Sequence, residues 1–368
     1  MGSRTAGGKP LSVGEVFDRG PNGLGAMRLV LAASVIMWHS FPLTGTTIEW
    51  RPLEQLVSSF RVDTFFAITG FLVLRSWERR PHIRNYVRGR LFRILPAFWV
   101  NLVVTALLIA PIAMMLSGGS VSALFEGPDN AFAYIGKNAS TWILGFDIAG
   151  TPAGVPYPGV WNGSLWMIPW EMLGYLGILI LGVLGLSGKR RVILGLALAA
   201  WLAVLANAFG VLPGGWYSET ASRFGLMLLS GSTLYVYRYK IRYSGNIALI
   251  ALGLFAVSGF LPDYRLLAAP MLAYLIFWAA LKLTSPKFRP KNDLSFGIFL
   301  YGFPVQQTLL LAGWPVMNPL LFGLAGLACT IPFAAASWFF IEKPAGALKR
   351  LIEKRAPDPR AYSAASRD

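Results

Sequence analysis

The sequence predicts an all-α integral membrane protein in which about ten transmembrane helices form one bundle, with both chain ends in the cytoplasm. Three observations predict this class. Apolar residues make up 55% of the 368 residues, and the mean hydropathy is +0.54. Charged residues make up only 14%, against about 25% in soluble domains. The apolar residues are grouped into runs of the length that crosses a bilayer core, about 20 residues.

The same composition excludes several other classes of protein. The apolar content excludes a disordered chain, and the single cysteine, Cys329, excludes a disulfide scaffold. The net charge of +16 does not indicate a nucleic-acid-binding protein, because the basic residues lie in short loops and not on a polar domain. We therefore expect a lipid bilayer, and no nucleic acid, as a partner.

Ten apolar runs follow one another along the chain. They lie near residues 24–42, 56–77, 94–116, 164–186, 192–210, 221–237, 246–262, 265–283, 294–313 and 319–341. We expect a cytoplasmic N-terminal segment over 1–22, a transmembrane domain over 23–345, and a basic, disordered cytoplasmic tail over 346–368. One long extracytoplasmic loop, about 117–163, interrupts the transmembrane domain.

The basic residues alternate between the loops, which tests the count of runs independently. Loops on one side of the predicted bundle hold 27 of the 33 lysines and arginines. Because positively charged loops stay in the cytoplasm, this side and both chain ends are predicted to be cytoplasmic. The first run is not expected to be a cleaved signal peptide, since it begins after about 23 residues and contains Arg28 and His39.

A few ionisable side chains lie inside or at the ends of the apolar runs, where they are costly and are functional candidates. They are Arg28, His39, Arg61, Asp63, Glu171 and Arg223. Arg28 and His39 are eleven residues apart, which places both on one helix face, about 16 Å apart. Counted from the ends of their runs, His39, Asp63 and Glu171 have similar depths, so we expect them to converge.

Each of these residues also has a structural interpretation. Asp63 is expected either to serve catalysis or to form an ion pair with Arg61 or Arg223. His39 is expected either to be a catalytic base or to be a neutral core imidazole bonded to a backbone carbonyl.

A second cluster occupies the cytoplasmic segment 75–93, RSWERRPHIRNYVRGRLFR, which has seven arginines and no lysine. Topology and anionic lipid headgroups account for positive charge on this side. They do not account for the choice of arginine, which is preferred where phosphate is bound through two parallel hydrogen bonds. We therefore assign phosphate binding to Arg84, Arg90 and Arg93, of which the last two lie three residues apart on one helix face.

The outer loop is rich in glycine, proline and aromatic residues, and a loop of this length is usually functional or disordered. Trp142, Tyr157 and Trp161 predict either a packed lid or sugar-binding rim, or anchors at the membrane interface. We assign binding of the sugar to Trp161, and to Trp166 and Tyr175 on either side of Glu171.

These segments together resemble the membrane-bound acyltransferase-3 family, whose members O-acylate sugars and other hydroxyl-bearing acceptors. The family's R-x10-H signature is matched by Arg28 and His39, and its R-x-x-R by Arg90 and Arg93. VDTFFAITGFLVLRS, over 62–76, matches a VD-x-FF-x-x-(S/T)-G-F segment. WNGSLWMIPWEMLGY is similar to a W-(S/T)-x-x-x-E region, and residues 341–344 match an (I/V)-E-(K/R)-P motif.

The resemblance extends over about residues 20–346, with the motifs in family order, and the chain departs from the family pattern in two respects. Gly302 stands where the family often has a histidine. We also expect the transmembrane domain to act without a fused esterase-like domain.

The resemblance implies a cytoplasmic acyl-CoA donor, acetyl-CoA in the first place, and an acceptor hydroxyl on a sugar-containing cell-envelope molecule. It implies a multi-pass protein of a bacterial plasma membrane. We expect His39 to be the general base and Glu171 or Asp63 to orient its imidazole. Arg28 is expected to join the donor-binding arginines. No metal and no permanently bound cofactor are expected, and direct transfer and an acyl-histidine intermediate both remain open.

A secondary transporter or lipid-linked-sugar flippase fits the same architecture. The paired Arg28 and His39 and the arginine-only segment favour the acyltransferase, because a transporter needs neither. A non-catalytic membrane scaffold leaves the intramembrane His39 and Glu171 without a role.

Overall fold

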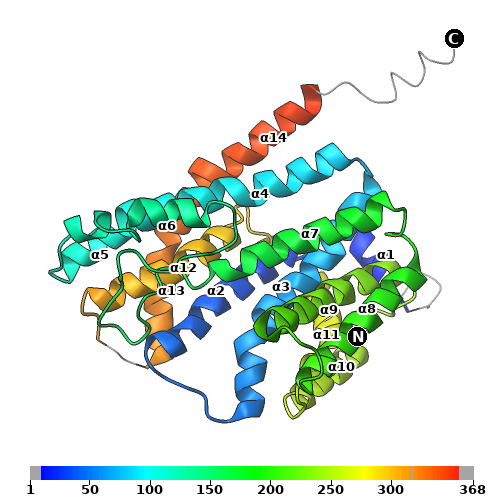
Figure 1. The fold of residues 1–368 in the computed structure, drawn as a ribbon. Helices are drawn as coiled ribbons and strands as arrows, with labels where there is room; N and C mark the ends of the chain where they lie inside the picture. Colours follow the sequence, from blue (N-terminus) through cyan, green and yellow to red (C-terminus); the bar gives the residue numbers. More distant parts are fainter. Residues whose placement is uncertain (1–9, 316–317, 356–368) are drawn as a thin grey trace.

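The computed structural model describes residues 10–315 and 318–355, which form helices and connecting loops with no strand among them (Figure 1). The parts of the predicted terminal segments at 1–9 and 356–368 lie outside the described residues. The helices are α1 (Val13–Asp18), α2 (Leu24–Leu43), α3 (Arg51–Arg79), α4 (Ile83–Val104), α5 (Ala110–Leu116), α6 (Ala131–Asn138), α7 (Ile168–Val183), α8 (Arg190–Ala208), α9 (Gly215–Tyr237), α10 (Gly245–Ser258), α11 (Arg265–Lys282), α12 (Ser295–Leu311), α13 (Pro319–Ser337) and α14 (Lys343–Arg355).

Seven helical stretches of the described residues are long and apolar enough to cross a membrane. They are Leu24–Leu43, Arg51–Arg79, Ile83–Leu116, Leu165–Val183, Arg190–Ala208, Arg265–Lys282 and Pro319–Glu353. The other three predicted spans are also helical, but α10 and α12 have only 14 and 17 residues, and α9 has no 18-residue stretch that is apolar enough. The chain is thus an all-helical protein of membrane type, whereas ten spans and two cytoplasmic ends remain predictions.

Helix α3 runs through the middle of the bundle and packs along α9 with direct backbone contact (Figure 1). A Cβ added to Gly70 of α3 would lie 1.8 Å from the carbonyl oxygen of Leu228, and one added to Gly231 of α9 would lie 1.9 Å from that of Ala67. No side chain fits at either position. Small residues at such crossings let transmembrane helices gain van der Waals contact, which is the main attraction between helices in lipid.

Helix α2 packs against α12 and α13 on one side and against α3 and α11 on the other. The amide of Gln306 in α12 donates hydrogen bonds to Ser40 Oγ, at 2.8 Å, and to the carbonyl oxygen of Ile36, at 3.3 Å. These contacts fix α12 against the second half of α2. Arg28 and His39 therefore lie near opposite ends of one helix that the bundle surrounds.

The chain before α7 enters the bundle without helical structure. Asn162 is only 1% exposed, and its amide donates to the carbonyl oxygen of Leu300, at 2.8 Å, and to Asn101 Oδ1, at 3.1 Å. Both partners lie inside long helices, α12 and α4. Irregular backbone at this depth is tolerated because protein, not lipid, surrounds it and satisfies its polar groups. As a result α7 begins well inside the bundle.

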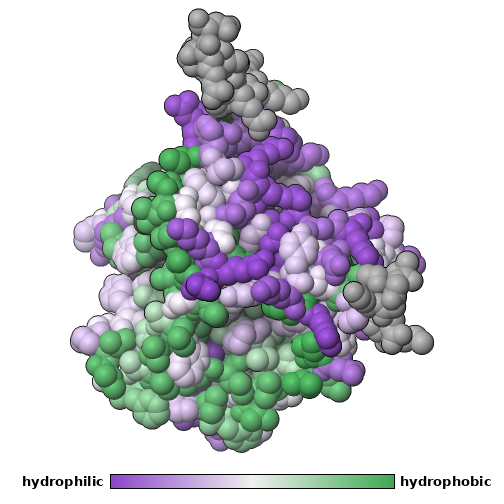
Figure 2. Space-filling view, turned by 90° about the vertical axis from the view of Figure 1, so that its right-hand side faces the viewer, coloured by the Kyte–Doolittle hydropathy of each residue, from purple (hydrophilic) through white to green (hydrophobic). Residues whose placement is uncertain are grey.

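Hydrophilic side chains gather in the upper and middle part of the view in Figure 2, and the lower part is largely hydrophobic. Exposed basic residues near the ends of α3, α4 and α14 include Arg79, Arg80, Arg84 and Arg350. Helix α14 packs on α4 and occupies the first part of the segment from 346 onward that the sequence led us to expect to be disordered. An ion pair between Lys349 and Glu353, at 3.5 Å, supports its helical conformation.

Candidate active site

The first half of α2, the middle of α4 and the loop before α12 bring two arginines to one carboxylate. Arg28 Nη2 lies 3.0 Å, and Arg93 Nη2 3.4 Å, from Asp293 Oδ2. Ser295 Oγ donates to the other carboxylate oxygen at 2.6 Å, which fixes its orientation. Burial raises the pKa of Asp293, but the two guanidinium groups outweigh burial and hold that pKa below its usual range.

These arginines line a cavity of about 110 Å³, which we call the arginine cavity. The polar and charged side chains that line it include Arg28, Arg90, Arg93, Glu171 and Tyr175. The Tyr175 hydroxyl donates a hydrogen bond to Glu171, and the Arg90 guanidinium lies 5.4 Å from the centre of the Tyr175 ring. These three guanidinium groups lie near the carboxylates of Glu171 and Asp293, and the Glu342 carboxylate is also close enough to Arg93 to interact with it.

Two of the guanidinium groups also have unused hydrogen-bond donors. The Nε atoms of Arg28 and Arg90 are buried and have no hydrogen-bond partner among the described residues. A buried donor without a partner is costly, and an anion that accepts from it relieves that cost. The cavity is therefore suited to bind a negatively charged group such as a phosphate.

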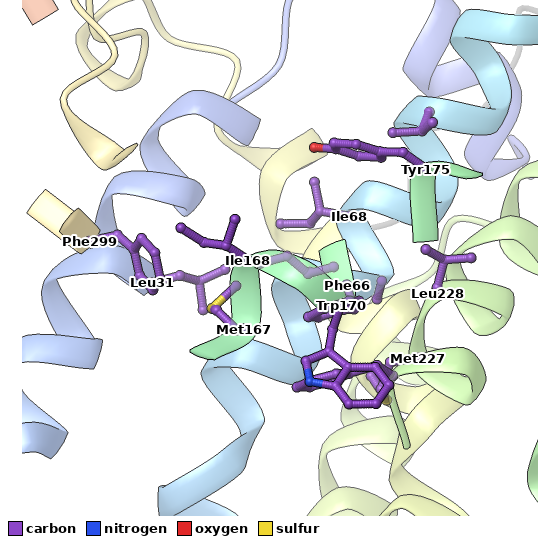
Figure 3. Packing of buried hydrophobic residues seen from close by; sticks show 14 of the residues in the cluster. Leu31, Phe66, Ile68, Met167, Ile168, Trp170, Tyr175, Met227, Leu228 and Phe299 are labelled. Atoms are coloured by element: carbon purple, nitrogen blue, oxygen red, sulfur yellow. The ribbon is translucent and has the colours of Figure 1, made fainter. Parts of the chain in front are cut away.

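Apolar side chains close the rest of the arginine cavity, among them Phe65, Ile68, Met167 and Phe299. Figure 3 shows Leu31, Met167 and Phe299 grouped together, with Ile68 between this group and Tyr175. The arginine cavity thus has charged hydrogen-bond donors in one part and apolar walls in another. It suits a ligand that has an anionic part and an apolar part. The apolar walls also strengthen the charge interactions by lowering the local dielectric.

His39 lies toward the other end of α2. Its ring meets Phe303 of α12 edge-on, with ring centroids 5.1 Å apart, and its Nδ1 is buried and has no partner in the described part of the chain. Phe303 is one helical turn from Phe299, which lines the arginine cavity. The cavity wall and the contact with His39 are thus separated by a rise of about 6 Å along α12.

Glu171 and Asp63, which we expected to converge on His39, do not hydrogen-bond to it among the described residues. Glu171 lies among the arginines, because the irregular chain before α7 carries the first turn of that helix deep into the bundle. The sequence suggested a similar depth for Glu171 and His39 only because the run from 164 resembles one continuous helix. Its first residues are in fact a loop and a short 3-10 turn, Leu165–Met167.

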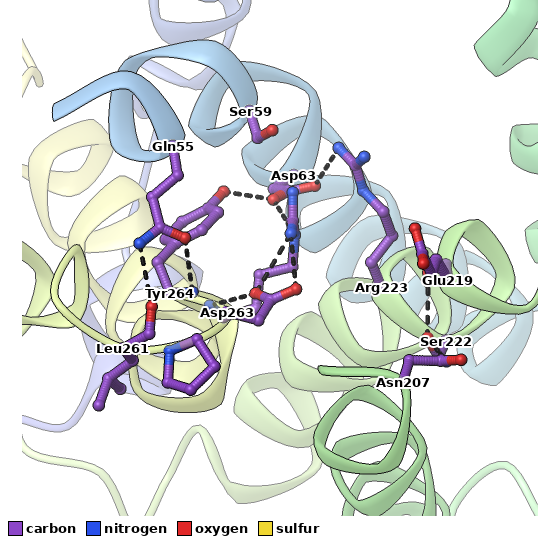
Figure 4. A network of polar contacts seen from close by, with 12 residues as sticks. Gln55, Ser59, Asp63, Asn207, Glu219, Ser222, Arg223, Leu261, Asp263 and Tyr264 are labelled. Carbon is purple, nitrogen blue, oxygen red and sulfur yellow. Dashed lines mark hydrogen bonds and ion pairs between the residues drawn. The ribbon is translucent and has the colours of Figure 1, made fainter. Parts of the chain in front are cut away.

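Asp63 is fully buried inside a separate ion-pair network (Figure 4). It accepts hydrogen bonds from Arg265 Nε, at 2.5 Å, from Arg223 Nη2, at 3.5 Å, and from the Tyr264 hydroxyl. The pairing with Arg223 is one of the two that the sequence left open. Arg61, the other possible partner, instead has its guanidinium 4.8 Å from the centre of the Phe60 ring.

Two residues of these clusters were not singled out from the sequence. Asp293 is the one acidic residue in the 283–294 loop, which otherwise carries Lys287, Arg289 and Lys291. Arg265 lies on the predicted extracytoplasmic side, where basic residues are rare. In the sequence, each of these two residues stands out because its charge is uncommon on its predicted side of the membrane.

Four further residues were expected to bind the donor or the acceptor, and three of them lie outside the arginine cavity. Arg84 is exposed in the first turn of α4 and does not line the arginine cavity. Trp161 is 0% exposed and its Nε1 donates to Thr151 Oγ1 at 3.0 Å, so its ring belongs to the core of the loop and is unavailable to an acceptor. Tyr175 lines the arginine cavity, whereas Trp166 lines a different one.

That second cavity, which we call the aromatic cavity, has a volume of about 500 Å³. It lies between the long loop and the starts of α7 and α9. The aromatic side chains that line it include Trp142, Tyr157, Trp166, Trp170, Trp216 and Tyr217.

Gly302, where the resemblance led us to look for a second histidine, has a packing role. A Cβ at this position would lie 2.5 Å from Ile36 Cγ1, because α12 and α2 approach closely here. The chain's second histidine, His82, is exposed at the start of α4, where its Nδ1 accepts from the backbone N–H of Asn85 at 3.4 Å. His39 is thus the histidine available inside the bundle.

Comparison with known proteins identifies the family of the chain. A family model described as an acyltransferase domain matches residues 22–339. Nodulation protein 10 of Rhizobium leguminosarum bv. viciae is 28% identical over 363 residues, covering 91% of this chain and 95% of that protein. An O-acetyl transferase of Shigella phage Sf6 is 24% identical over 331 residues, covering 86% of this chain and 93% of that protein. No solved structure matches significantly. The chain belongs to the acyltransferase-3 family.

Proposed function

We propose that the protein transfers an acyl group, acetyl in the first place, from acyl-CoA to a hydroxyl of a sugar-containing cell-envelope acceptor. Membership of an acyltransferase family supports acyl transfer over the transporter or flippase that the architecture alone left open. The relative named an O-acetyl transferase supports acetyl as the group and oxygen as the acceptor atom.

The arginine cavity is the observation that carries the choice of donor. Coenzyme A joins phosphates to a long, mostly uncharged arm that ends in the thioester. The guanidinium groups of Arg28, Arg90 and Arg93 suit the phosphates, and the apolar walls suit the arm. The thioester then points along α12 toward Phe303 and His39.

His39 is the proposed base. Its imidazole takes the proton of the acceptor hydroxyl while that oxygen attacks the thioester carbonyl carbon. The new C–O bond forms, the C–S bond breaks, and the departing thiolate recovers the proton from the imidazolium. In the variant with an acyl-histidine intermediate, the imidazole nitrogen attacks the thioester carbonyl carbon, the C–S bond breaks and the CoA thiolate leaves. The acceptor oxygen then attacks the acyl group, the C–N bond breaks to free the imidazole, and the hydroxyl proton passes to the thiolate.

The orientation of the reaction follows from the distribution of charge. The side that carries the exposed basic residues Arg79, Arg80, Arg84 and Arg350 is assigned to the cytoplasm, where acyl-CoA is available, and the long loop with its aromatic cavity to the opposite side. In this arrangement Glu171 and Tyr175 are positioning residues, since the Tyr175 ring lies under the Arg90 guanidinium and its hydroxyl bonds to Glu171, and neither residue is bonded to His39.

The experiment that tests this function uses the purified full-length protein in liposomes with acetyl-CoA and a soluble oligosaccharide. Acyl transfer predicts release of free CoA and O-acetylated product, both dependent on the oligosaccharide. Movement of the oligosaccharide across the bilayer without CoA release would contradict the proposal and support the transporter.

A further inference from the structure

The aromatic cavity adjoins a polar cavity. The polar cavity has a volume of about 310 Å³ and lies between the end of α8, the start of α9 and the loop before α11. Trp216 lines both cavities. Each has the size of an ordinary ligand pocket, about 300–1,000 Å³. The two cavities meet at Trp216, and we call them together the recess, with an aromatic half and a polar half.

The aromatic half is a cluster and not a belt of membrane anchors. The Trp142 and Tyr217 rings are stacked, with an interplanar angle of 10°, although they come from the long loop and from α9. Trp216 approaches Trp166 and Trp170, with ring centroids at 5.8 and 6.0 Å. Interfacial anchors spread around a bundle at one level. These rings instead converge on a single hollow.

The polar half offers hydrogen-bond donors and acceptors with little net charge. Arg223 and Arg265 line it, but Asp63 and Asp263 already pair with them. The Nε of Arg223 remains buried and without a hydrogen-bond partner among the described residues. The exposed carboxylate of Glu219 lines the same space. Such a surface suits a neutral ligand that carries many hydroxyl groups, and it does not suit a lipid tail.

The aromatic half also lies next to the proposed base. Phe303 contacts His39 on one side and Tyr157, which lines the cavity, on the other, with centroid distances of 5.1 and 6.0 Å. A Cβ at Gly163 would lie 2.7 Å from the Phe303 ring, so the absence of a side chain lets that ring lie against the loop. The Phe303 ring thus contacts both His39 and the lining of the aromatic cavity.

We infer that this recess binds the acceptor, and that the acceptor is a neutral oligosaccharide of at least two sugar units. One sugar ring stacks on the aromatic half, beside Phe303, and presents the hydroxyl that is acylated. The neighbouring unit hydrogen-bonds to Glu219 and Arg223 in the polar half. That the bound saccharide is the acceptor rests on the proposed function, whereas binding of the saccharide does not depend on acyl transfer.

Binding is tested on the full-length protein in detergent without any acyl donor. The probes are neutral mono-, di- and trisaccharides of glucose, galactose, rhamnose and N-acetylglucosamine, with farnesyl phosphate as the lipid probe. Quenching of tryptophan fluorescence is followed. We expect saturable quenching by at least one di- or trisaccharide, with the matching monosaccharide about tenfold weaker. No saturation by any saccharide, equal affinity for the monosaccharide, or saturation by farnesyl phosphate alone would overturn the inference.

Variants assign the binding to the recess. Trp216 is 51% exposed, so Trp216→Ala is expected to fold and to weaken the best saccharide about tenfold. Glu219→Gln is expected to remove the preference for the disaccharide while leaving monosaccharide binding unchanged. Trp50→Ala, which removes an exposed tryptophan that lines neither cavity, is the matched control. Unchanged saccharide affinity in folded Trp216→Ala protein overturns the inference.

The same measurements separate this inference from the proposed function. Saccharide binding that depends on Trp216, without CoA release, supports the recess as a binding site and contradicts acyl transfer. CoA release with an acceptor KM that is equal in wild-type and Trp216→Ala protein supports the transfer and overturns the recess as its acceptor site.

Discussion

Asp293 holds the guanidinium group of Arg28 at 3.0 Å, across 265 residues of sequence. The same carboxylate oxygen lies 3.4 Å from Arg93. A carboxylate therefore lies between two of the arginines assigned to the donor phosphates. It keeps like charges together, and it competes with any anion that enters the cavity.

The first prediction concerns this competition. Asp293→Asn removes the negative charge and leaves both arginines free to bind an incoming phosphate. We expect the KM for acetyl-CoA to fall about fivefold, which corresponds to about 1 kcal/mol. Initial rates of CoA release over a range of acetyl-CoA concentrations measure it. An increased KM would show that Asp293 orients the arginines instead of competing for them.

The same pair predicts a dependence of stability on pH. Because the folded protein holds the pKa of Asp293 below its usual range, the carboxylate stabilises the fold above its unfolded-state pKa of about 4. That contribution disappears as the pH falls through the folded-state value. Asp293→Asn should therefore have a lower Tm than wild type at pH 7, and the difference should shrink below about pH 4. A difference that is constant with pH would contradict the pairing.

A third prediction concerns donor binding by α4. The double variant Arg90→Ala, Arg93→Ala removes two charged hydrogen-bond donors from the cavity. We expect the KM for acetyl-CoA to rise at least about tenfold, since each such bond contributes about 1.5–3 kcal/mol. Arg80→Ala is the control, because this arginine is exposed in the same basic segment and lines no part of the cavity. An unchanged KM in the folded double variant would remove these arginines from the donor site.

The structure confirms that Arg28 and His39 lie in one helix, α2, where spacing alone predicts which face they share. The same holds for Arg90 and Arg93 of α4, although only Arg93 reaches Asp293. Local periodicity also predicted that the chain would be all-helical, since helices in lipid satisfy their own backbone groups.

What the sequence did not predict depends on contacts between distant segments. The position of Glu171 inside the bundle follows from Asn162. The hydrogen bonds of Asn162 to Asn101 and Leu300 hold the non-helical segment before α7 inside the bundle. No periodic pattern encodes such a contact. Asp293 reaches Arg28 only because the loop before α12 folds back over the start of α2. A count of residues from the ends of apolar runs detects neither arrangement.

A fourth prediction concerns the role of Asp63. Breaking a buried ion pair by removing one partner costs about 3–5 kcal/mol, so Asp63→Asn should lower Tm strongly. The remaining folded protein should keep its turnover, because Asp63 contacts Arg265 and Arg223 and not His39. Asp18→Asn, which breaks a more exposed pair with Arg75, should change Tm little. Stable but inactive Asp63→Asn protein would assign Asp63 to catalysis.

The most direct test of the account is the turnover of His39→Gln with acetyl-CoA and the best-binding oligosaccharide. His82→Asn is the matched control, since His82 is the other histidine of the chain and lies exposed at a helix start where asparagine also caps well. Removal of a general base should lower kcat at least about 100-fold. Acetyl-CoA binding and Tm should remain those of the wild type. Wild-type turnover in folded His39→Gln protein would contradict the account.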